Sequence, residues 1–225
     1  TPHGSGPAVK QKLLSLLCAI LTALTVLTGA IAVPILCRPF YYAHVNAYHL
    51  TEYGWSQDEI YTAYNEMMDY CTGRREDFSA GVLAFSESGA SHFADVRGLF
   101  LLDLQVLFLC LPLLAVLLVV CRWKRLAFAR FWGRGPGFWA AAGLGGGFIA
   151  VGLLAALDFD RAFVIFHQIF FPGKENWIFD SRTDPIILLL PQDFFRNCAL
   201  LILGLLLVWC GTLIVLDFRG KNGTA

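Results

Sequence analysis

Charged side chains are scarce in this sequence. Asp, Glu, Lys and Arg make up 15% of its 225 residues, whereas soluble domains carry about 25%. Apolar residues make up 57% of the chain. A composition this poor in charge excludes an ordinary water-soluble domain and predicts a membrane protein.

Several motifs of known chemistry are also missing. The seven cysteines include no CxxC pair and no metal-ligand spacing. The sequence contains no HExxH and no third ligand at a convincing spacing, so a zinc hydrolase is not indicated. It also contains no GxSxG nucleophile elbow. No basic patch interleaved with aromatics indicates nucleic-acid binding. We therefore expect no metal, no cofactor and no nucleic acid.

Four long apolar runs are present instead, at residues 13–36, 99–120, 138–157 and 198–216. Each is close to the roughly 20 residues that cross a bilayer as a helix. The first run is longer than the about 7–15 residues of a signal-peptide core, and no small-x-small cleavage site follows it. The sequence predicts an all-α polytopic membrane protein with four transmembrane helices, which leaves no room for a separate soluble domain of normal size.

The basic residues predict the orientation of these helices. Nine of the 17 Lys and Arg lie in the chain ends and the loop 121–137, whereas 15 of the 17 acids lie in 37–98 and 158–197. Cytoplasmic segments carry the excess of basic residues. We expect cytoplasmic tails (1–12 and 217–225), a cytoplasmic loop (121–137), and two extracytoplasmic loops (37–98 and 158–197) that form a small cap.

The first extracytoplasmic loop contains one well-marked helix, predicted over 57–72. Ser56 and Glu59 form a capping box, in which each side chain satisfies a free backbone N–H of the other. Apolar residues then recur at helical spacing, at Ile60, Tyr64, Met67 and Cys71. Gly73 follows the last turn, the usual place for a helix-ending glycine.

Two other patterns have structural interpretations. Gly143 and Gly147 form a GxxxG, which predicts close helix packing. Cys37, Cys71 and Cys198 would lie on the outer side, and spacing leaves open whether two of them form a disulfide.

The histidines carry the functional hypothesis. His44 and His49 show no partner in the sequence, so we interpret them as surface residues. His92 and His167 each lie at the outer end of a span, at the same predicted depth. Taken singly, either one fits a packed structural histidine; the matched pair favours chemistry.

Acidic and aromatic residues surround this pair in the predicted helices. At about 100° per residue, Asp95 lies about 60° from His92 and Asp103 about 20° to the other side, so all three share a face. Asp95 at i+3 is expected to reach the His92 imidazole, while Asp103, about 16 Å further along, is expected to be a buried structural acid. An aromatic stripe runs beside His167, at Phe159, Phe163, Phe166 and Phe170.

Acyl transfer suits two histidines at a membrane boundary. Imidazole, with an ordinary pKa of about 6.5, gives or takes a proton at neutral pH. One ring can remove a proton from the attacking group while the other protonates the leaving oxygen or stabilises the oxyanion. Lipid ester bonds lie between headgroup and acyl chain, which is the depth predicted for both side chains.

Three stretches resemble the lipoprotein intramolecular transacylase family of Gram-positive bacteria. They are Ser86-Glu-Ser-Gly-Ala-Ser-His92-Phe-Ala-Asp95-Val-Arg97, Trp55-Ser-Gln-Asp-Glu-Ile60, and the stretch 166–195 that begins Phe166-His167-Gln-Ile-Phe-Phe-Pro. The resemblance implies a multi-pass protein of the bacterial plasma membrane that moves the sn-2 acyl chain of a diacylglyceryl-cysteine lipoprotein to the α-amino group of the same cysteine. It places the family's two essential histidines at His92 and His167. Cys71 is not a feature that we associate with the family.

The predicted site has His92 and His167 as catalytic residues, supported by Asp95 and Arg97. The substrate-pocket candidates are aromatic: Phe93, Phe163, Phe166, Phe170, Phe171 and Trp177. The expected partners are diacylglyceryl-modified lipoproteins and membrane lipids, and we expect a monomer. The alternatives are a non-enzymatic four-span scaffold, which would tolerate loss of both histidines, and a bis-histidine haem protein, which would show a Soret band.

Overall fold

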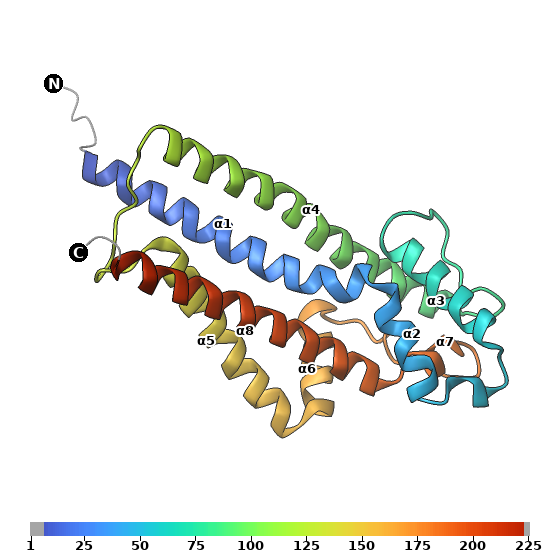
Figure 1. Ribbon diagram of the computed structural model, residues 1–225. Coiled ribbons are helices and arrows are strands. Elements are labelled where there is room, and N and C mark those ends of the chain that lie inside the picture. Colours follow the sequence, from blue (N-terminus) through green and yellow to red (C-terminus); the bar gives the residue numbers. More distant parts are fainter. Residues whose placement is uncertain (1–6, 223–225) are drawn as a thin grey trace. The chain divides into compact units, whose positions relative to one another are not determined.

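The computed structural model describes residues 7–222, and the regular elements in that range are helices, apart from an isolated bridge between Phe131 and Arg134. The helices are α1 (Pro7–Leu36), α2 (Arg38–Ala47), the 3-10 helix η1 (Leu50–Tyr53), α3 (Gln57–Cys71), α4 (Glu87–Trp123), α5 (Pro136–Leu157), α6 (Phe159–Phe170), α7 (Ile186–Leu189) and α8 (Gln192–Asn222) (Figure 1). The predicted all-α fold is confirmed. Of the predicted tails, residues 1–6 and 223–225 lie outside the described residues.

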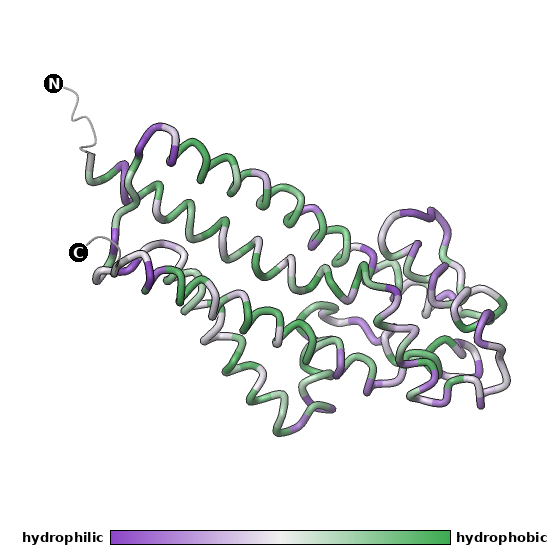
Figure 2. Tube along the Cα trace, viewed as in Figure 1, coloured by the Kyte–Doolittle hydropathy of each residue, from purple (hydrophilic) through white to green (hydrophobic). Residues whose placement is uncertain are grey.

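Four helices are long and apolar enough to cross a bilayer: α1, α4, α5 and α8. Hydrophobic residues dominate their traces in Figure 2, and the prediction of four spans is confirmed. Helix α4 has 37 residues, about 55 Å at about 1.5 Å per residue, against about 30 Å of bilayer hydrocarbon. Its first turns, which include His92, therefore extend beyond the apolar run.

The described chain divides into two compact units. The first contains residues 7–30, 105–153 and 203–222, and the second contains residues 31–104 and 154–202. The two predicted catalytic histidines both belong to the second unit.

In the first unit, α5 packs on α8 through glycines other than those predicted. A Cβ on Gly145 would lie 3.3 Å from the Cβ of Cys210, and one on Gly152 would lie 2.9 Å from a Leu203 methyl. Gly143 and Gly147 have no neighbour within 4 Å of the Cβ position, so the prediction that they form the packing surface is wrong. At about 100° per residue they lie about 160° around α5 from Gly145, on another face.

The first unit also anchors the 124–135 loop. Asp217 of α8 pairs with Arg130 at 3.2 Å and with Arg134 at 3.4 Å, and it accepts the Gly135 N–H at 3.0 Å. The guanidinium of Arg134 also lies 3.6 Å from the ring centroid of Phe218. One acid on α8 therefore neutralises two of the loop's cations.

In the second unit, α2, η1, α3 and α7 pack together as a small cluster. The ring of Tyr41 stacks on Tyr64 with centroids 3.6 Å apart, and its hydroxyl donates to the Leu189 carbonyl at 3.0 Å. Both hydrogen bonds of the predicted capping box are present, and the four residues of the predicted apolar stripe on α3 are buried. Gly73 has a φ of 76°, the left-handed conformation that a helix-ending glycine supplies.

The expectation about His44 needs revision. His44 is half-buried, with Nδ1 2.6 Å from the Phe40 carbonyl and Nε2 3.0 Å from the Asn197 amide nitrogen. The interpretation of His44 as a partnerless surface residue was therefore wrong, because its partner is 153 residues away in sequence. His49 is exposed, as expected. All seven cysteines lie in the described range and are free, so the structure has no disulfide there.

Candidate active site

His92 of α4 and His167 of α6 lie side by side. Their ring centroids are 5.9 Å apart and the ring planes differ by 30°. The two residues are only 6% and 7% exposed. The structure thus brings together the two histidines that the sequence singled out, although 74 residues separate them.

Helix α6 begins with a side-chain cap and carries the buried His167 near its end. The Asp158 side chain caps the helix by accepting the Arg161 N–H at 2.9 Å. His167 is the buried residue of this 12-residue helix. The carbonyl of His167 then accepts the N–H of Phe171 at 2.8 Å, where α6 ends.

One hydrogen bond sets the tautomer of His167. Its Nδ1 lies 2.8 Å from the Phe163 carbonyl. A carbonyl only accepts hydrogen bonds, so Nδ1 carries the proton and Nε2 holds the lone pair in the neutral ring. Burial lowers the pKa of His167 below its ordinary value, and the bond to the Phe163 carbonyl partly opposes that shift. A neutral imidazole with a basic Nε2 is the resulting form at neutral pH.

His92 is held by apolar rings instead. It lies edge-on to Phe171, with centroids 5.0 Å apart, and to Phe179, with centroids 5.4 Å apart. Its Nδ1 is buried and has no hydrogen-bond partner. An imidazole in such surroundings favours the neutral form, because burial without a partner penalises charge.

Asp95 does not bond to His92, which corrects the prediction that it reaches the imidazole. Its carboxylate accepts hydrogen bonds from the Lys174 ammonium and, at 3.0 Å, from the Asn176 amide. The other amide contact of Asn176 is with Ser91, at 3.4 Å. Asp95 therefore joins α4 to the segment after α6.

The segment after α6, which contains Lys174, Asn176 and Trp177, covers His167. Trp177 stacks on the His167 ring with centroids 4.6 Å apart, and its indole N–H donates to the Lys174 carbonyl at 3.0 Å. The Oδ1 of Asn176 is buried without a partner. The Asp95 bonds to Lys174 and Asn176 thus fix the residues immediately before Trp177.

A second tie, not foreseen from the sequence, holds the start of α4. Asp184 is 3% exposed and accepts the Ser86 N–H and hydroxyl, each at 2.8 Å, and the Thr183 hydroxyl at 2.7 Å. A Cβ on Gly89 would overlap the Asp184 carboxylate. Glycine is therefore required for this close approach, one turn before His92.

Arg97 has a structural position in the first loop. Its guanidinium donates to the carbonyls of Arg75 at 2.8 Å and Glu76 at 3.2 Å, and it lies over the Tyr70 ring at 4.7 Å. The structure places it away from the histidine pair, on the side of α4 that holds the first loop.

The aromatic pocket candidates divide into three groups. Phe163, Phe171 and Trp177 contact His167, with ring centroids 4.3, 5.7 and 4.6 Å from it, and the partly exposed Phe166 lies edge-on to it at 5.5 Å. Phe166 and Phe170 are 47% and 48% exposed, and their rings pack on each other at 4.6 Å. Phe93 is buried and stacks on Phe78 at 4.8 Å. Its ring also lies 5.7 Å from that of Phe179, which contacts His92.

Four residues of this site were missed by sequence reasoning: Lys174, Asn176, Phe179 and Asp184. All four lie in the stretch that follows α6 and includes Trp177. For Lys174, Asn176 and Asp184, the available signal was polar side chains in a stretch that also carries Trp177 and Phe179. Among residues 7–222 there is no group of three or more His, Cys, Asp or Glu placed to hold a metal ion.

Comparisons with known proteins identify the family. The model of the family described as lipoprotein intramolecular transacylase Lit matches residues 16–195, whereas comparison with curated protein sequences gives no match.

Solved structures share the fold. An in meso structure of the membrane integral lipoprotein intramolecular transacylase Lit from Bacillus cereus has a TM-score of 0.82 at 23% identity, covering 96% of this chain and 99% of that chain. A second structure of that protein, with a histidine-to-arginine mutation, has a TM-score of 0.77 at 22% identity, covering 97% of this chain and 96% of that one. The family model covers most of α1, all of α4 and α5, the cluster of α2, η1, α3 and α7, and both histidines, and this chain belongs to the lipoprotein intramolecular transacylase family.

Proposed function

We propose that this acyltransferase moves the sn-2 acyl chain of a diacylglyceryl-cysteine lipoprotein to the α-amino group of the same cysteine, using His92 and His167. The product is a lyso-form, N-acylated lipoprotein. The observation that carries the proposal is the pairing of two buried imidazoles with centroids 5.9 Å apart, of which one has its tautomer fixed by a carbonyl. Family membership supplies the class of reaction.

His167 acts as the base and then as the acid. Its Nε2 lone pair takes a proton from the attacking nitrogen, whose ordinary pKa as an α-amino group is about 7.7–8.0. The lowered pKa of His167 keeps the ring unprotonated at neutral pH, so it is ready to accept. The same nitrogen then returns the proton to the departing sn-2 oxygen. One N–C bond forms, one C–O bond breaks, and the proton moves from nitrogen to oxygen.

His92 stabilises the charge that develops between these steps. With Nδ1 enclosed, its Nε2–H is the group that would donate to the carbonyl oxygen of the tetrahedral intermediate. A neutral donor held in an apolar site is effective there, because little reorganisation is needed when charge appears. The donor and acceptor groups of the substrate belong to one molecule, so proximity replaces an acyl-enzyme.

Of the two predicted supporting residues, Asp95 acts on the segment that carries Trp177, and Arg97 acts on the first loop. Asp95 holds Lys174 and Asn176, which place Trp177 on His167, while Arg97 fixes the first loop to α4. The exposed Phe166 and Phe170 of α6 offer surface for an acyl chain. We place the site on the extracytoplasmic face of the membrane, with both termini cytoplasmic, because the basic residues concentrate at the other end of the spans.

The test uses a synthetic diacylglyceryl-cysteinyl peptide with acyl chains of different length at sn-1 and sn-2. After incubation with the purified chain, mass spectrometry with fragmentation should find the sn-2 chain on the α-amino group and the sn-1 chain still on glycerol. Transfer of the sn-1 chain, or hydrolysis without N-acylation, would contradict the proposal.

A crossover control tests the intramolecular step. Two peptides of different mass, with differently labelled sn-2 chains, are mixed before the enzyme is added. Each peptide should keep its own label. Exchanged labels would show that the acyl group leaves its molecule.

A further inference from the structure

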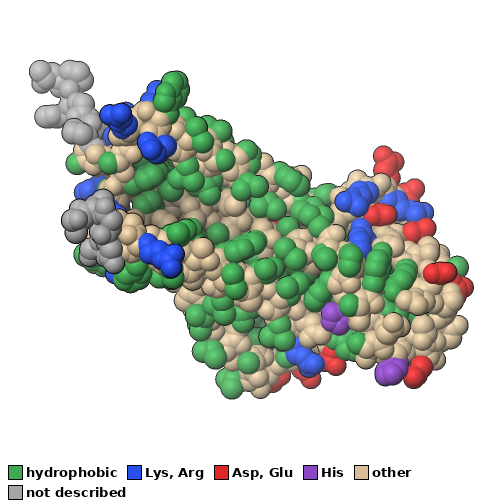
Figure 3. Space-filling view, in the orientation of Figure 1, with side chains coloured by type: hydrophobic (Ala, Val, Ile, Leu, Met, Phe, Trp, Pro, Cys, Tyr) green, Lys and Arg blue, Asp and Glu red, His purple; other side chains and the backbone are tan. Residues whose placement is uncertain are grey.

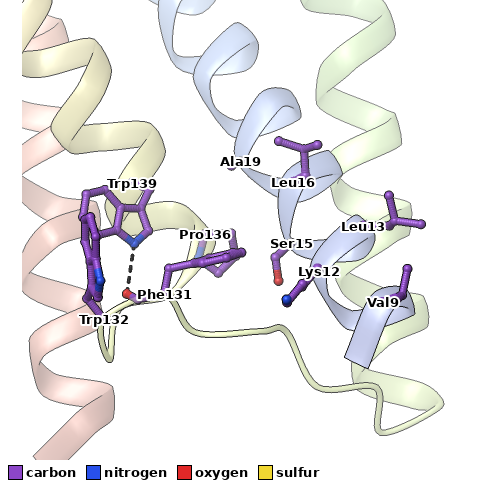
Figure 4. A pocket seen from close by; sticks show the side chains of 10 residues that line it. All are labelled: Val9, Lys12, Leu13, Ser15, Leu16, Ala19, Phe131, Trp132, Pro136 and Trp139. Atoms are coloured by element: carbon purple, nitrogen blue, oxygen red, sulfur yellow. Dashed lines mark hydrogen bonds between the residues drawn. The ribbon is translucent and has the colours of Figure 1, made fainter. Parts of the chain in front are cut away.

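A second candidate site lies in the first unit, whereas His92 and His167 belong to the second. A hollow of about 450 Å³ opens between the start of α1 and the segment that leads into α5 (Figure 4). Its lining residues are Val9, Lys12, Leu13, Ser15, Leu16, Ala19, Phe131, Trp132, Pro136 and Trp139. This volume is within the range of about 300–1,000 Å³ that small-molecule sites occupy.

The wall of the hollow has few free hydrogen-bonding groups. The Ser15 hydroxyl lies 2.9 Å from the Gln11 carbonyl and 3.1 Å from the Ala129 carbonyl, so it already has acceptors. The Trp139 indole N–H donates to the Phe131 carbonyl at 3.2 Å, the bond drawn in Figure 4. An occupant of this wall gains by burying apolar surface, not by hydrogen bonding.

One cation lies at the edge of this apolar wall. Lys12 is exposed, and it has no ion-pair partner among the residues that the structure describes. The lining contains no acidic residue, and the nearby Arg130 and Arg134 are already paired with Asp217. Figure 3 shows blue Lys and Arg side chains without red acids on the visible face of this end of the first unit. The site therefore combines an apolar wall with an uncompensated positive charge.

We propose that this hollow binds one acyl chain of an anionic phospholipid, from the leaflet that contacts this end of the spans, with the phosphate group at Lys12. Trp132 is 90% exposed and lies edge-on to Trp139, with centroids 5.4 Å apart. Tryptophan is enriched where headgroups meet acyl chains. The hollow therefore supplies an apolar wall for an acyl chain, an exposed indole suited to the interface and a cation for the phosphate.

The experiment is native mass spectrometry of the purified full chain with phosphatidylglycerol or phosphatidylcholine of identical acyl chains. The parent should retain more phosphatidylglycerol than phosphatidylcholine. Leu16→Trp fills the hollow and should remove one bound phosphatidylglycerol. Leu17→Trp makes the same change at an exposed residue that does not line the hollow, and it should leave binding unchanged.

Lys12→Gln tests the charge separately, at an exposed position that should not disturb folding. It should lower phosphatidylglycerol binding about fivefold, the effect expected of one cation near a lipid surface, with phosphatidylcholine binding unchanged. Equal retention of both lipids by the parent would overturn the proposal, as would undiminished phosphatidylglycerol binding by Leu16→Trp or Lys12→Gln. A loss as large in Leu17→Trp as in Leu16→Trp would also overturn it.

Discussion

At the scale of single residues, His92 and His167 show how two copies of one side chain acquire different properties. The Phe163 carbonyl holds the Nδ1–H of His167 and leaves a basic Nε2. His92 lies edge-on to Phe171 and Phe179 and has a buried Nδ1 without a partner. His167 supplies the basic nitrogen and His92 supplies the neutral N–H donor, so the proposed reaction needs both rings at once.

The first prediction is that the two histidines act as a unit. His92→Ala, His167→Ala and the double variant should each lower the rate of N-acylation by about 10²–10⁴-fold, with similar residual rates, because groups that act together are strongly non-additive. The measurement is conversion of the diacylglyceryl peptide to its lyso N-acyl form. Membrane insertion and expression should match the parent. Losses of a few-fold that multiply in the double variant would indicate two independent binding residues.

A second prediction concerns Asp95, whose carboxylate bonds to Lys174 instead of His92. Asp95→Asn and Lys174→Met should slow the reaction to a similar, modest degree, and the double variant should be no slower than either. Residues that share one interaction show this coupling in a double-mutant cycle. Independent effects that add in the double variant would instead mean that Asp95 acts on His92 by itself. Glu87→Gln, an exposed acid in the first turn of α4, serves as the control for loss of charge.

At the scale of elements, the start of α4 depends on a contact that is distant in sequence. Ser86 donates its hydroxyl to Asp184 and accepts the N–H of Gly89 at 3.0 Å. Asp184 itself is buried against Gly89. The serine, the glycine and the acid therefore fix the angle at which α4 presents His92, one turn later.

The third prediction compares two glycines of α4. Gly89→Ala should destabilise the protein by about 1–3 kcal/mol, the usual cost of overpacking, because the added methyl overlaps Asp184. Gly98→Ala adds the same methyl where nothing lies within 4 Å, so it should be neutral or slightly stabilising. Thermal unfolding in detergent measures both. If Gly89→Ala were as stable as Gly98→Ala, Asp184 would not be packed on α4 as described.

Some elements could be predicted from local sequence and others could not. The four spans and α3 follow from run length, a capping box and apolar spacing, all of which act within about 25 residues. The packing glycines of α5 were mispredicted because a GxxxG occurs on one face of the helix while Gly145 and Gly152 lie on the face that meets α8. Which face meets a neighbour is decided by tertiary structure, which local spacing does not specify.

At the scale of the whole chain, some parts of the site could also be predicted from local sequence, whereas others depend on tertiary structure. His92 was predictable because it lies at the start of a long apolar helix, along which depth in a bilayer can be counted. His167 was predicted at the outer end of the third span, but α5 ends at Leu157 and His167 lies on a separate helix, α6, that begins after a break at Asp158. The Asp95–Lys174 contact joins residues 79 apart, and the Ser86–Asp184 contact joins residues 98 apart. Their partners depend on how the loop after α6 folds back on α4, and no period in the sequence encodes that path.

The last prediction is the orientation of the chain in the membrane. Glu76 lies in the first predicted extracytoplasmic loop and Lys124 in the predicted cytoplasmic one, and both are exposed. Glu76→Cys should react with a membrane-impermeant thiol reagent in intact cells, and Lys124→Cys only after permeabilisation. The native cysteines are buried or half-buried, so the parent provides the background. The reverse pattern would place the histidine pair on the cytoplasmic side, away from lipoprotein N-termini on the outer surface, and the proposed acyl transfer could not occur there.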